Sequence, residues 1–514
     1  MISKINTAVC MGINGKAVCV ETDISNGLPN MSIVGLASTM VMESKERIKS
    51  AIVNSGYEYP RGRVTVNLTP ADVRKTGNGL DLPIAIGLLT AAMYVSNSKA
   101  RNYGMIGALS LDGEVMGIEG VLPMILCMVE EGIKKLIIPT ANYNEACLVK
   151  GVELIPVASL RECVDIINDE IPFDGGSMQM LPMEKTDKYE IREDVLDFSD
   201  IKGQEAAKRA ITIAVTGRHG LLMVGSPGCG KTMLARRIPT IMPAMTPREL
   251  IETAIVYSIE GKNNRDGKIS IERPFRSPHN SIGRAGLLGG GNNHPVPGEI
   301  TLAHNGVLFL DEACEFDRDK IESLRQPIED REITHVRAGI PYTFPCNFQL
   351  VMASNPCKCG YYGDSEHLCK CTQVQLEQYR RKLSGPMMDR IDLRIQMETV
   401  TYKEIAEDKL ISQSSEEMRN DVRRGIEFAK QMGRGIANGD MTDADLDKYC
   451  KLGKEEKNLM KNAYNRLGLS PRSYKKILKV ARTIADMDES RDIKEEHLAE
   501  ALSYRMLTEV NSAA

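Results

Sequence analysis

The chain has 514 residues, of which 42% are hydrophobic and 26% charged, and its formal net charge is −4 at pH 7. This composition is typical of a soluble globular protein of two to four domains. The slight negative charge excludes nucleic-acid binding that depends on overall charge alone. The 13 cysteines and the lack of an apolar stretch after Met1 predict a reducing, cytoplasmic setting, with no membrane insertion.

Residues 1–169 alternate short apolar strands with helical patterns, which predicts a mixed α/β domain. Five strands are expected, at Val18–Thr22, Ser32–Leu36, Arg63–Leu68, Met105–Leu109 and Lys135–Pro139. Four helices are expected, at Met42–Asn54, Leu82–Tyr94, Pro123–Glu131 and Ser159–Ile167. Residues 170–195 are rich in Pro, Gly and mixed charge, which predicts a linker.

The segment 225–232 matches the GxxxxGKT pattern of a phosphate-binding loop. An apolar run at 221–224 precedes it as a strand, and a helical pattern follows it. The backbone of such a loop wraps a phosphate, and the helix N-terminus adds a favourable dipole. Lys231 would contact the β- and γ-phosphates, and the Thr232 hydroxyl would hold Mg²⁺. The predicted nucleotide-binding residues are Gly225, Ser226, Pro227, Gly228, Cys229, Gly230, Lys231 and Thr232.

A second motif follows about 80 residues later, where the apolar run Val307–Leu310 ends in Asp311 and Glu312. Asp311 would bind the Mg²⁺ shell, and Glu312 would polarise the attacking water. Two acids can also end an ordinary strand, but the upstream loop favours an ATP- or GTP-hydrolysing domain over residues 196–398. Within it, residues 273–299 form a long insert rich in Gly and Pro, of a kind that is usually functional or mobile.

Two further residues are candidates for the same site. The apolar run Val351–Ser354 is predicted to lie beside the preceding strand, which would aim Asn355 at the γ-phosphate; a turn before Pro356 is the alternative. Arg390 lies between acidic residues after a helix end. It is either an arginine finger that reaches a neighbouring subunit's ATP, or part of a surface ion pair worth less than about 1 kcal/mol.

Two close cysteine pairs lie in the loop 357–371. Their spacing can bring four thiolates to one tetrahedral Zn²⁺, with glycines between the pairs that allow the loop to turn. A site with four protein ligands is structural, because it leaves no open position. Four unrelated thiols are the alternative, and His367 could replace one of the thiolates. The predicted zinc ligands are Cys357, Cys359, Cys369 and Cys371.

The remaining residues, 399–514, follow a helical pattern that breaks at Gly468 and Pro471, which predicts a helical lid. Several motifs then occur in one order: Gly203–Glu205, the phosphate-binding loop, Pro274–His279, Leu324–Asp330, Ser354–Cys357, Ser384–Asp392 and Ile477–Asp486. In this order the chain resembles the YifB/ComM family of magnesium-chelatase-like AAA+ ATPases over essentially its whole length.

The resemblance implies roles for three residues and a mode of assembly. Asn355 is implied to be sensor 1, Arg390 the arginine finger and Arg472 sensor 2 in the lid. ATP and Mg²⁺ are the implied cofactors. A ring, in this family a homo-hexamer, is implied because the finger must come from a neighbour.

The N-terminal domain resembles the proteolytic domain of Lon-type proteases in two segments, 74–86 and 107–122. A serine–lysine dyad needs a hydroxyl and an amine within hydrogen-bond distance. The matching positions read Gly-Leu-Asp-Leu around the serine and Leu122 at the lysine. We therefore expect a non-catalytic domain of the ribosomal S5 domain 2-like fold, and a protease is disfavoured.

Four basic regions are candidate DNA contacts: the N-terminal domain, the insert 273–299, a predicted hairpin over 332–339, and a basic stripe in the lid. The family resemblance implies a DNA motor with branch-migration or helicase activity on single-stranded or branched DNA, during integration of transforming DNA. The alternative is a protein-remodelling ATPase of the magnesium-chelatase type. These basic residues could instead be ordinary solvated surface charge. For the stripe in the lid, a position around the ATP phosphates is a further alternative. The candidate basic residues are Lys45, Arg47, Lys49, Arg61, Arg63, Arg74 and Lys75 in the N-terminal domain, Arg273, Arg276 and Arg284 in the insert, and Arg472, Lys475, Lys476, Lys479 and Arg482 in the lid.

Overall fold

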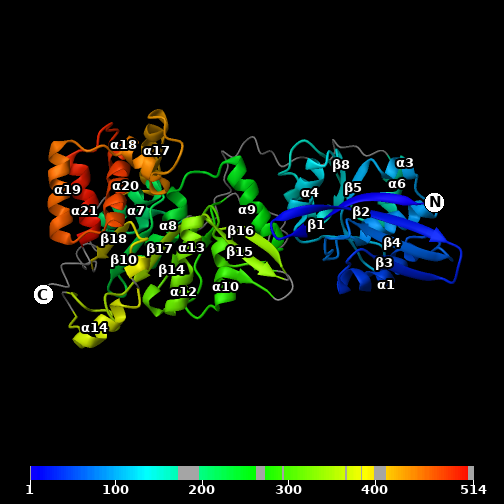
Figure 1. Ribbon diagram of the computed structural model, residues 1–514, viewed down its shortest axis with the longest axis horizontal. Helices are drawn as coiled ribbons and strands as arrows, with labels where there is room; N and C mark the ends of the chain where they lie inside the picture. Colours follow the sequence, from blue (N-terminus) through cyan, green and yellow to red (C-terminus); the bar gives the residue numbers. More distant parts are fainter. Residues whose placement is uncertain are drawn as a thin grey trace.

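The computed structural model describes residues 2–171, 196–261, 272–291, 295–337, 339–364, 367–383, 385–398 and 412–506. The molecule is elongated, with a seven-stranded sheet at one end, a five-stranded sheet in the middle and a group of helices at the other end (Figure 1). Nearly all of the predicted linker and the beginning of the predicted lid lie outside the described residues. Among the described helices, none combines the length and the apolar character that crossing a membrane requires.

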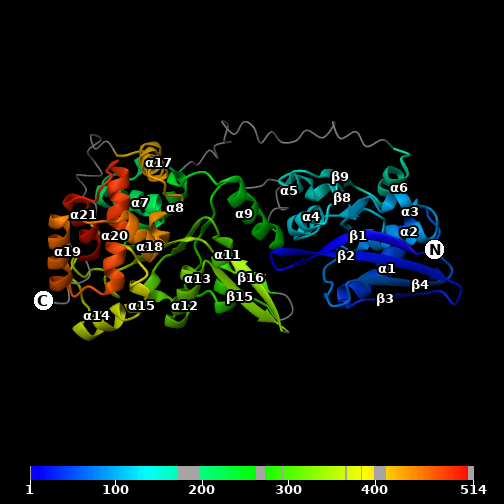
Figure 2. The same ribbon diagram turned by 45° about the horizontal axis from the view of Figure 1, so that its top comes forward.

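The N-terminal region is built on a mixed sheet with the strand order β3-β4-β2-β1-β5-β8-β9. Strands β1 and β2 pair antiparallel from Ser3 opposite Thr22 to Met11 opposite Asn14, and their turn extends toward the middle of the molecule (Figure 2). The predicted strand Met105–Leu109 is divided between β5 and the short β6. The strands are β1 Ser3–Met11, β2 Asn14–Ser25, β3 Asn30–Val34, β4 Arg63–Thr69, β5 Tyr103–Met105, β6 Ala108–Leu109, β7 Val115–Met116, β8 Lys135–Pro139 and β9 Glu153–Val157.

The sequence pattern predicted neither β1 nor β9. Strand β9 contains Pro156, which has no N–H to donate a hydrogen bond to a neighbouring strand. The proline is tolerated because β9 lies at the edge of the sheet. The four predicted helices form, but α2 ends before Tyr94 because Met93 adopts a φ of 66°. The helices of this region are α1 Thr39–Asn54, α2 Asp81–Ala91, α3 Asn97–Ala100, α4 Val121–Glu130, α5 Tyr143–Ala146 and α6 Leu160–Asn168.

The middle region is a five-stranded parallel sheet with the order β11-β14-β17-β10-β18. Its central strands are apolar and almost fully buried, so helices cover both faces. Because every pair is parallel, the carboxyl ends of β10, β14 and β17 meet at one edge. The strands are β10 Leu221–Gly225, β11 Phe275–Arg276, β14 Val307–Leu310, β17 Gln349–Ser354 and β18 Leu393–Met397. The helices of this region include α7 Glu205–Gly217, α8 Lys231–Ile241, α9 Pro247–Ile259, α12 Arg318–Ser323, α13 Arg325–Asp330, α14 Gln373–Arg380 and α15 Gly385–Met388.

Two hairpins project from this sheet. The insert 273–299 is more regular than its composition suggests, since its described part holds α10 Arg284–Leu288, α11 Glu299–Leu302 and the hairpin of β12 Gly289–Gly290 with β13 Val296–Pro297. The predicted second hairpin forms from β15 Glu332–Arg337 and β16 Ile340–Pro345.

The C-terminal region is helical throughout its described part, as predicted. Helix α20 begins at Pro471, where Ser470 caps its first turn, and the preceding helix α19 ends at Gly468 with a φ of 58°. Helix α20 is largely buried against α7, α17 and α21. The helices are α17 Ser415–Gln431, α18 Asp443–Tyr449, α19 Lys454–Leu467, α20 Pro471–Met487 and α21 Glu495–Met506.

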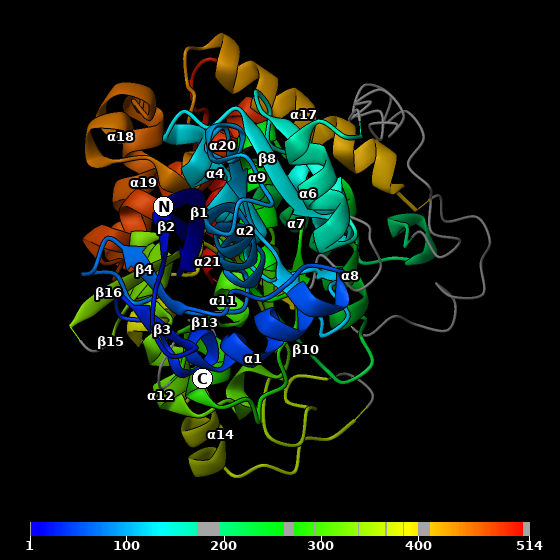
Figure 3. The ribbon, with the colours of Figure 1, turned by 90° about the vertical axis from the view of Figure 1, so that its right-hand side faces the viewer.

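The N-terminal region stands in front of the five-stranded sheet region when the molecule is viewed along its long axis (Figure 3). Helix α9 of the middle region packs on α4 of the N-terminal region, and Ala254 of α9 joins the core around Ile125. The backbone N–H of Gly120 donates to the carbonyl of Ser258 at 2.9 Å. The two regions therefore share a small apolar core in addition to the chain that connects them.

Candidate active site

The segment 225–232 forms a loop between β10 and α8, at the edge where the parallel strands end. Gly228 and Gly230 have φ angles of 84° and 92°, in the left-handed region that favours glycine. Helix α8 begins at Lys231, so its free N–H groups face the loop. The loop therefore offers backbone donors and a helix dipole to an anionic phosphate.

The Lys231 amine lies at the centre of this loop. Its Nζ donates to the carbonyls of Gly225 at 2.6 Å and Ser226 at 2.9 Å. It also donates to Oδ1 of Asn355 at 3.2 Å, because Asn355 follows β17 and β17 lies next to β10. The structure thus brings the motif lysine into contact with Asn355, which lies 124 residues away in sequence.

A second pair lies beside the first. The Thr232 hydroxyl donates to Oδ2 of Asp311 at 2.7 Å. A hydroxyl and a carboxylate are the hard oxygen ligands that Mg²⁺ prefers, so these two residues are suited to hold it next to the phosphates. A bound Mg²⁺ would neutralise charge on the phosphate oxygens.

Glu312 adopts an unusual backbone conformation directly after the strand. Its φ of 49° and ψ of 47° are left-handed, which is uncommon for glutamate, and its N–H donates to Oδ1 of Asp311 at 2.9 Å. Strain of this kind is concentrated at functional sites. The side chain is exposed, which leaves its carboxylate accessible to water.

Arg390 and Arg472 meet at one carboxylate. The Arg390 guanidinium, which is 8% exposed, lies 2.9 Å from Oε1 of Glu329 and donates to the carbonyl of Pro386 at 2.8 Å. Arg472 of the lid pairs with the same Glu329 oxygen. Both arginines are far from Glu329 in sequence, so no local pattern indicated these pairings.

A buried ion pair lies just beyond Arg390. Asp392 accepts from Lys476 of the lid helix α20, and its Oδ2 lies 3.2 Å from Nδ1 of His219. Burial alone would raise the pKa of Asp392, but Lys476 and His219 hold the pKa well below its usual range. The carboxylate therefore stays charged and ties the lid to the end of the Arg390 segment.

The basic stripe of the lid is engaged within the protein. Beyond Arg472 and Lys476, Lys475 pairs with Asp443 at 2.7 Å, Lys479 donates to the carbonyl of Gly439 at 3.0 Å, and Arg482 is buried against Asp486. These contacts hold the lid together and leave Lys476 and Arg482 largely buried, whereas Arg472 and Lys475 stay about half exposed at 47% and 45%.

Several other basic candidates are also engaged. In the insert, Arg273 bonds Glu249 and Arg276 forms a two-pronged pair with Glu299 at 2.6 and 2.7 Å. In the N-terminal region, Lys75 is buried on the carbonyl of Pro70. Their positive charge had suggested phosphate contacts; the structure assigns them to intramolecular pairs.

The N-terminal segments that resemble Lon-type proteases hold other side chains where the dyad would be. Asp81 is buried and pairs with Arg47, whose Nε donates to its Oδ2 at 2.7 Å. Burial raises the pKa of Asp81, and Arg47 opposes that shift. Leu122 is fully buried in the apolar core next to α9.

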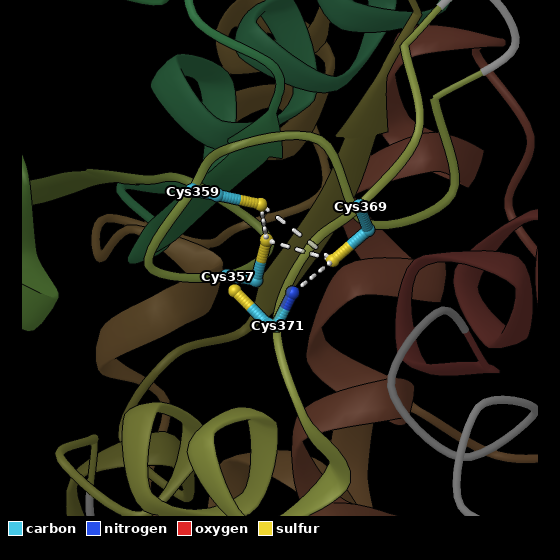
Figure 4. Close-up of side chains that lie close together, drawn as sticks. All are labelled: Cys357, Cys359, Cys369 and Cys371. Atoms are coloured by element: carbon cyan, nitrogen blue, oxygen red, sulfur yellow. Dashed lines mark hydrogen bonds between the residues drawn. The ribbon is translucent and has the colours of Figure 1, made fainter.

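The four loop cysteines converge on one point (Figure 4). Their sulfurs lie within 4.8 Å of one another, and Cys357 is 3.3 Å from Cys359 and 3.7 Å from Cys369. A tetrahedral ion with metal–sulfur bonds of about 2.3 Å requires sulfur separations of about 3.8 Å. The donor set therefore fits a tetrahedral metal.

Comparison with known proteins covers nearly the whole chain. Three family models match the chain. The model described as magnesium chelatase, subunit ChlI, matches residues 197–405. The model described as subunit ChlI of Mg-chelatase matches residues 20–142, and the model of the ChlI C-terminal part matches residues 412–505. Competence protein ComM of Haemophilus influenzae is 40% identical over 97% of this chain and 96% of its own. The uncharacterized protein YifB of Escherichia coli is 38% identical over 98% and 97%. Lon protease 2 of Bacillus subtilis is 31% identical over 26% of each chain.

Two substitutions should separate nucleotide binding from hydrolysis. Lys231→Ala should lose measurable ATP affinity, because the loop loses the amine that its carbonyls hold in place. Glu312→Gln should bind ATP normally and hydrolyse it at least about 100-fold more slowly, as expected when a general base is removed. Calorimetric titration and phosphate release measure the two effects. Normal turnover by Glu312→Gln would contradict its role in activating water.

Proposed function

The chain belongs to the YifB/ComM family of magnesium-chelatase-like AAA+ ATPases, and we propose that it is a hexameric motor that uses ATP hydrolysis to act on DNA. Its proposed activity is branch migration or helicase action on single-stranded or branched DNA, during integration of transforming DNA. The name of the competence protein that is 40% identical to it supports this setting.

The observation that carries the proposal is a pair of hairpins joined to each other. Arg337 of β15 donates to the carbonyl of Gly291 at 2.8 Å, and Nε2 of His335 lies 3.2 Å from the carbonyl of Leu288. Arg337 and Val336 are exposed. An exposed arginine beside glycine backbone is suited to a phosphodiester strand, because the strand needs positive charge and can approach glycine closely.

The β15–β16 hairpin also connects the elements of the ATP site. Strand β15 follows α13, which carries Glu329, the partner of Arg390 and Arg472. Strand β16 leads through a short segment into β17, which ends beside Asn355. A change around the γ-phosphate at Asn355, or around Arg390, can therefore shift the base of the hairpin that would contact DNA.

The ring is supported by where Arg390 and Arg472 lie. Within the described chain their contacts are with Glu329 and nearby carbonyls, and Lys231 belongs to a separate set of contacts. We infer that both arginines complete the ATP site of a neighbouring subunit, where a phosphate would compete with Glu329 for them. Arg472 would then act as sensor 2 across the interface.

The cysteine cluster is proposed to hold one structural Zn²⁺. Cys357, Cys359, Cys369 and Cys371 supply four thiolates, and zinc with this donor set cross-links a loop without taking part in the reaction.

DNA-dependent hydrolysis separates this function from its alternative, a motor that remodels a protein partner. ATPase activity should rise several-fold with single-stranded or branched DNA. Arg337→Ala should lose most of that stimulation and lower DNA affinity roughly fivefold or more, because a phosphate contact disappears. Arg248→Ala, at another exposed arginine of the same region, should behave like the wild type. If no DNA affects the rate, the protein-remodelling alternative is favoured.

Arg390 should act across the subunit interface. Arg390→Ala should bind ATP nearly normally and hydrolyse it roughly 10³-fold more slowly. Mixing it with Lys231→Ala protein should restore part of the activity, since an intact loop can then sit beside an intact finger. Subunit exchange is first verified with labelled protein. No recovery after verified exchange would rule out action in trans.

Metal analysis tests the zinc site directly. Protein purified without chelator should contain one Zn²⁺ per chain, and the double variant Cys369→Ser with Cys371→Ser should contain none. Substituting Cys450→Ser, a cysteine of the lid, should leave the zinc content unchanged. A wild-type protein without zinc, or a double variant that keeps it, would contradict the assignment.

A further inference from the structure

The cysteine loop, residues 357–371, lies directly against the phosphate-binding loop. The hydroxyl of Ser226 donates to Oδ2 of Asp364 at 2.6 Å. The Asp364 side chain is only 1% exposed, and its other oxygen accepts from the backbone N–H of His367 at 2.9 Å. Asp364 therefore joins Ser226 to the stretch of chain that leads into Cys369.

A second contact lies one residue further along the phosphate-binding loop. A Cβ placed on Gly360 would lie 2.7 Å from Cγ and Cδ of Pro227, so the backbone at Gly360 touches the proline ring. Gly360 has a φ of 90°, and its N–H donates to the carbonyl of Cys357 at 3.0 Å. The turn over residues 357–360 thus supports Pro227, while Asp364 supports Ser226.

These contacts join two sites that the sequence presents as separate. Ser226 and Pro227 are the first variable residues of the nucleotide-binding motif. The cysteines lie more than 120 residues further along the chain and begin just after Asn355. On sequence position alone, the metal is expected to fix the loop between Asn355 and Arg390. The structure adds that the same loop contacts the nucleotide-binding loop, through Asp364 at Ser226 and through Gly360 at Pro227.

We propose that metal binding at the four cysteines and nucleotide binding at the phosphate-binding loop are positively coupled through the contact between Ser226 and Asp364. This proposal rests on the zinc site proposed above. The metal fixes the cysteine loop, and the fixed Asp364 holds Ser226 in the conformation that accepts a phosphate. A loop that is already ordered loses less conformational entropy when the nucleotide binds.

Reciprocity gives this coupling a second consequence. If the metal raises nucleotide affinity by some factor, the nucleotide must raise metal affinity by the same factor. Because zinc leaves when the cysteine loop opens, and a bound nucleotide makes that opening less frequent, we expect the gain in zinc affinity to appear as slower zinc release. This effect can be measured on the intact, metal-loaded protein, so it does not require the metal-free protein to stay folded.

The experiment follows zinc release into an excess of a chromophoric chelator that is selective for zinc over Mg²⁺. Full-length protein is used with and without saturating Mg²⁺ and ADP, which occupies the loop without turnover. We expect ADP to slow release at least about fivefold, at the lower end of typical coupling between sites. Ser226→Ala should bind ADP more weakly; with ADP raised to saturation, as checked by calorimetry, it should release zinc as fast as it does without ADP.

Two controls locate the effect. Leu368→Ser changes a residue of the same loop that is 90% exposed, and it should keep the full response to ADP. Lys231→Ala should show no response, because it should not bind ADP. Wild-type protein that contains no zinc would overturn the metal site itself. Zinc release that ADP does not slow would overturn the coupling while leaving the metal site intact, and an equal response in Ser226→Ala would overturn the assigned contact.

Discussion

The parallel alignment of β14, β17 and β10 is the constraint on which the site depends. Parallel neighbours end at the same edge of a sheet, so Asp311, Asn355 and the loop before Lys231 must meet there although they are far apart in sequence. The strands can run side by side only because they are apolar and almost fully buried. The hydrogen bonds from Lys231 to Asn355 and from Thr232 to Asp311 are local consequences of that alignment.

The lid is fixed to this sheet through charge. Asp392 precedes β18, lies two residues after Arg390, and is paired with Lys476 of α20 in a buried setting. Leaving one member of such a pair alone costs about 3–5 kcal/mol, so lid and sheet separate only at a high cost. Glu329 adds a more exposed contact to Arg390 and Arg472. We infer that α20, Arg390 and the base of the β15–β16 hairpin move as a unit, which is what a coupled motor requires.

The sequence predicted the local elements of the site well and its long-range contacts poorly. The loop 225–232, the strand before Asp311, the strand before Asn355 and the hairpin at 332–339 form where short-range patterns indicated them. Strand β9 was missed because Pro156 argues against a strand unless its place at the sheet edge is known. Charge alone suggested that Arg276 and Lys75 contact phosphate, but Arg276 pairs with Glu299, 23 residues away in sequence, and Lys75 donates to the carbonyl of Pro70. The sequence did not predict the contact of Asp364 with Ser226, because no local pattern indicates that two segments 138 residues apart lie side by side.

In the N-terminal region, an apolar side chain stands at a position where a Lon-type protease has a catalytic lysine, and it takes part in domain packing instead. Leu122 occupies the position that resembles the lysine of Lon-type proteases, and it is fully buried in the core that α9 completes. Its backbone N–H lies 3.5 Å from the Ser258 hydroxyl at the end of α9. A lysine here would bury an ammonium without a carboxylate in an apolar core, at a cost of several kcal/mol. The apolar residue that is incompatible with the dyad is therefore the same one that lets the N-terminal region pack on the ATPase sheet region. Since α9 also contacts β13 and α11, this packing connects the N-terminal region to the proposed DNA-binding elements.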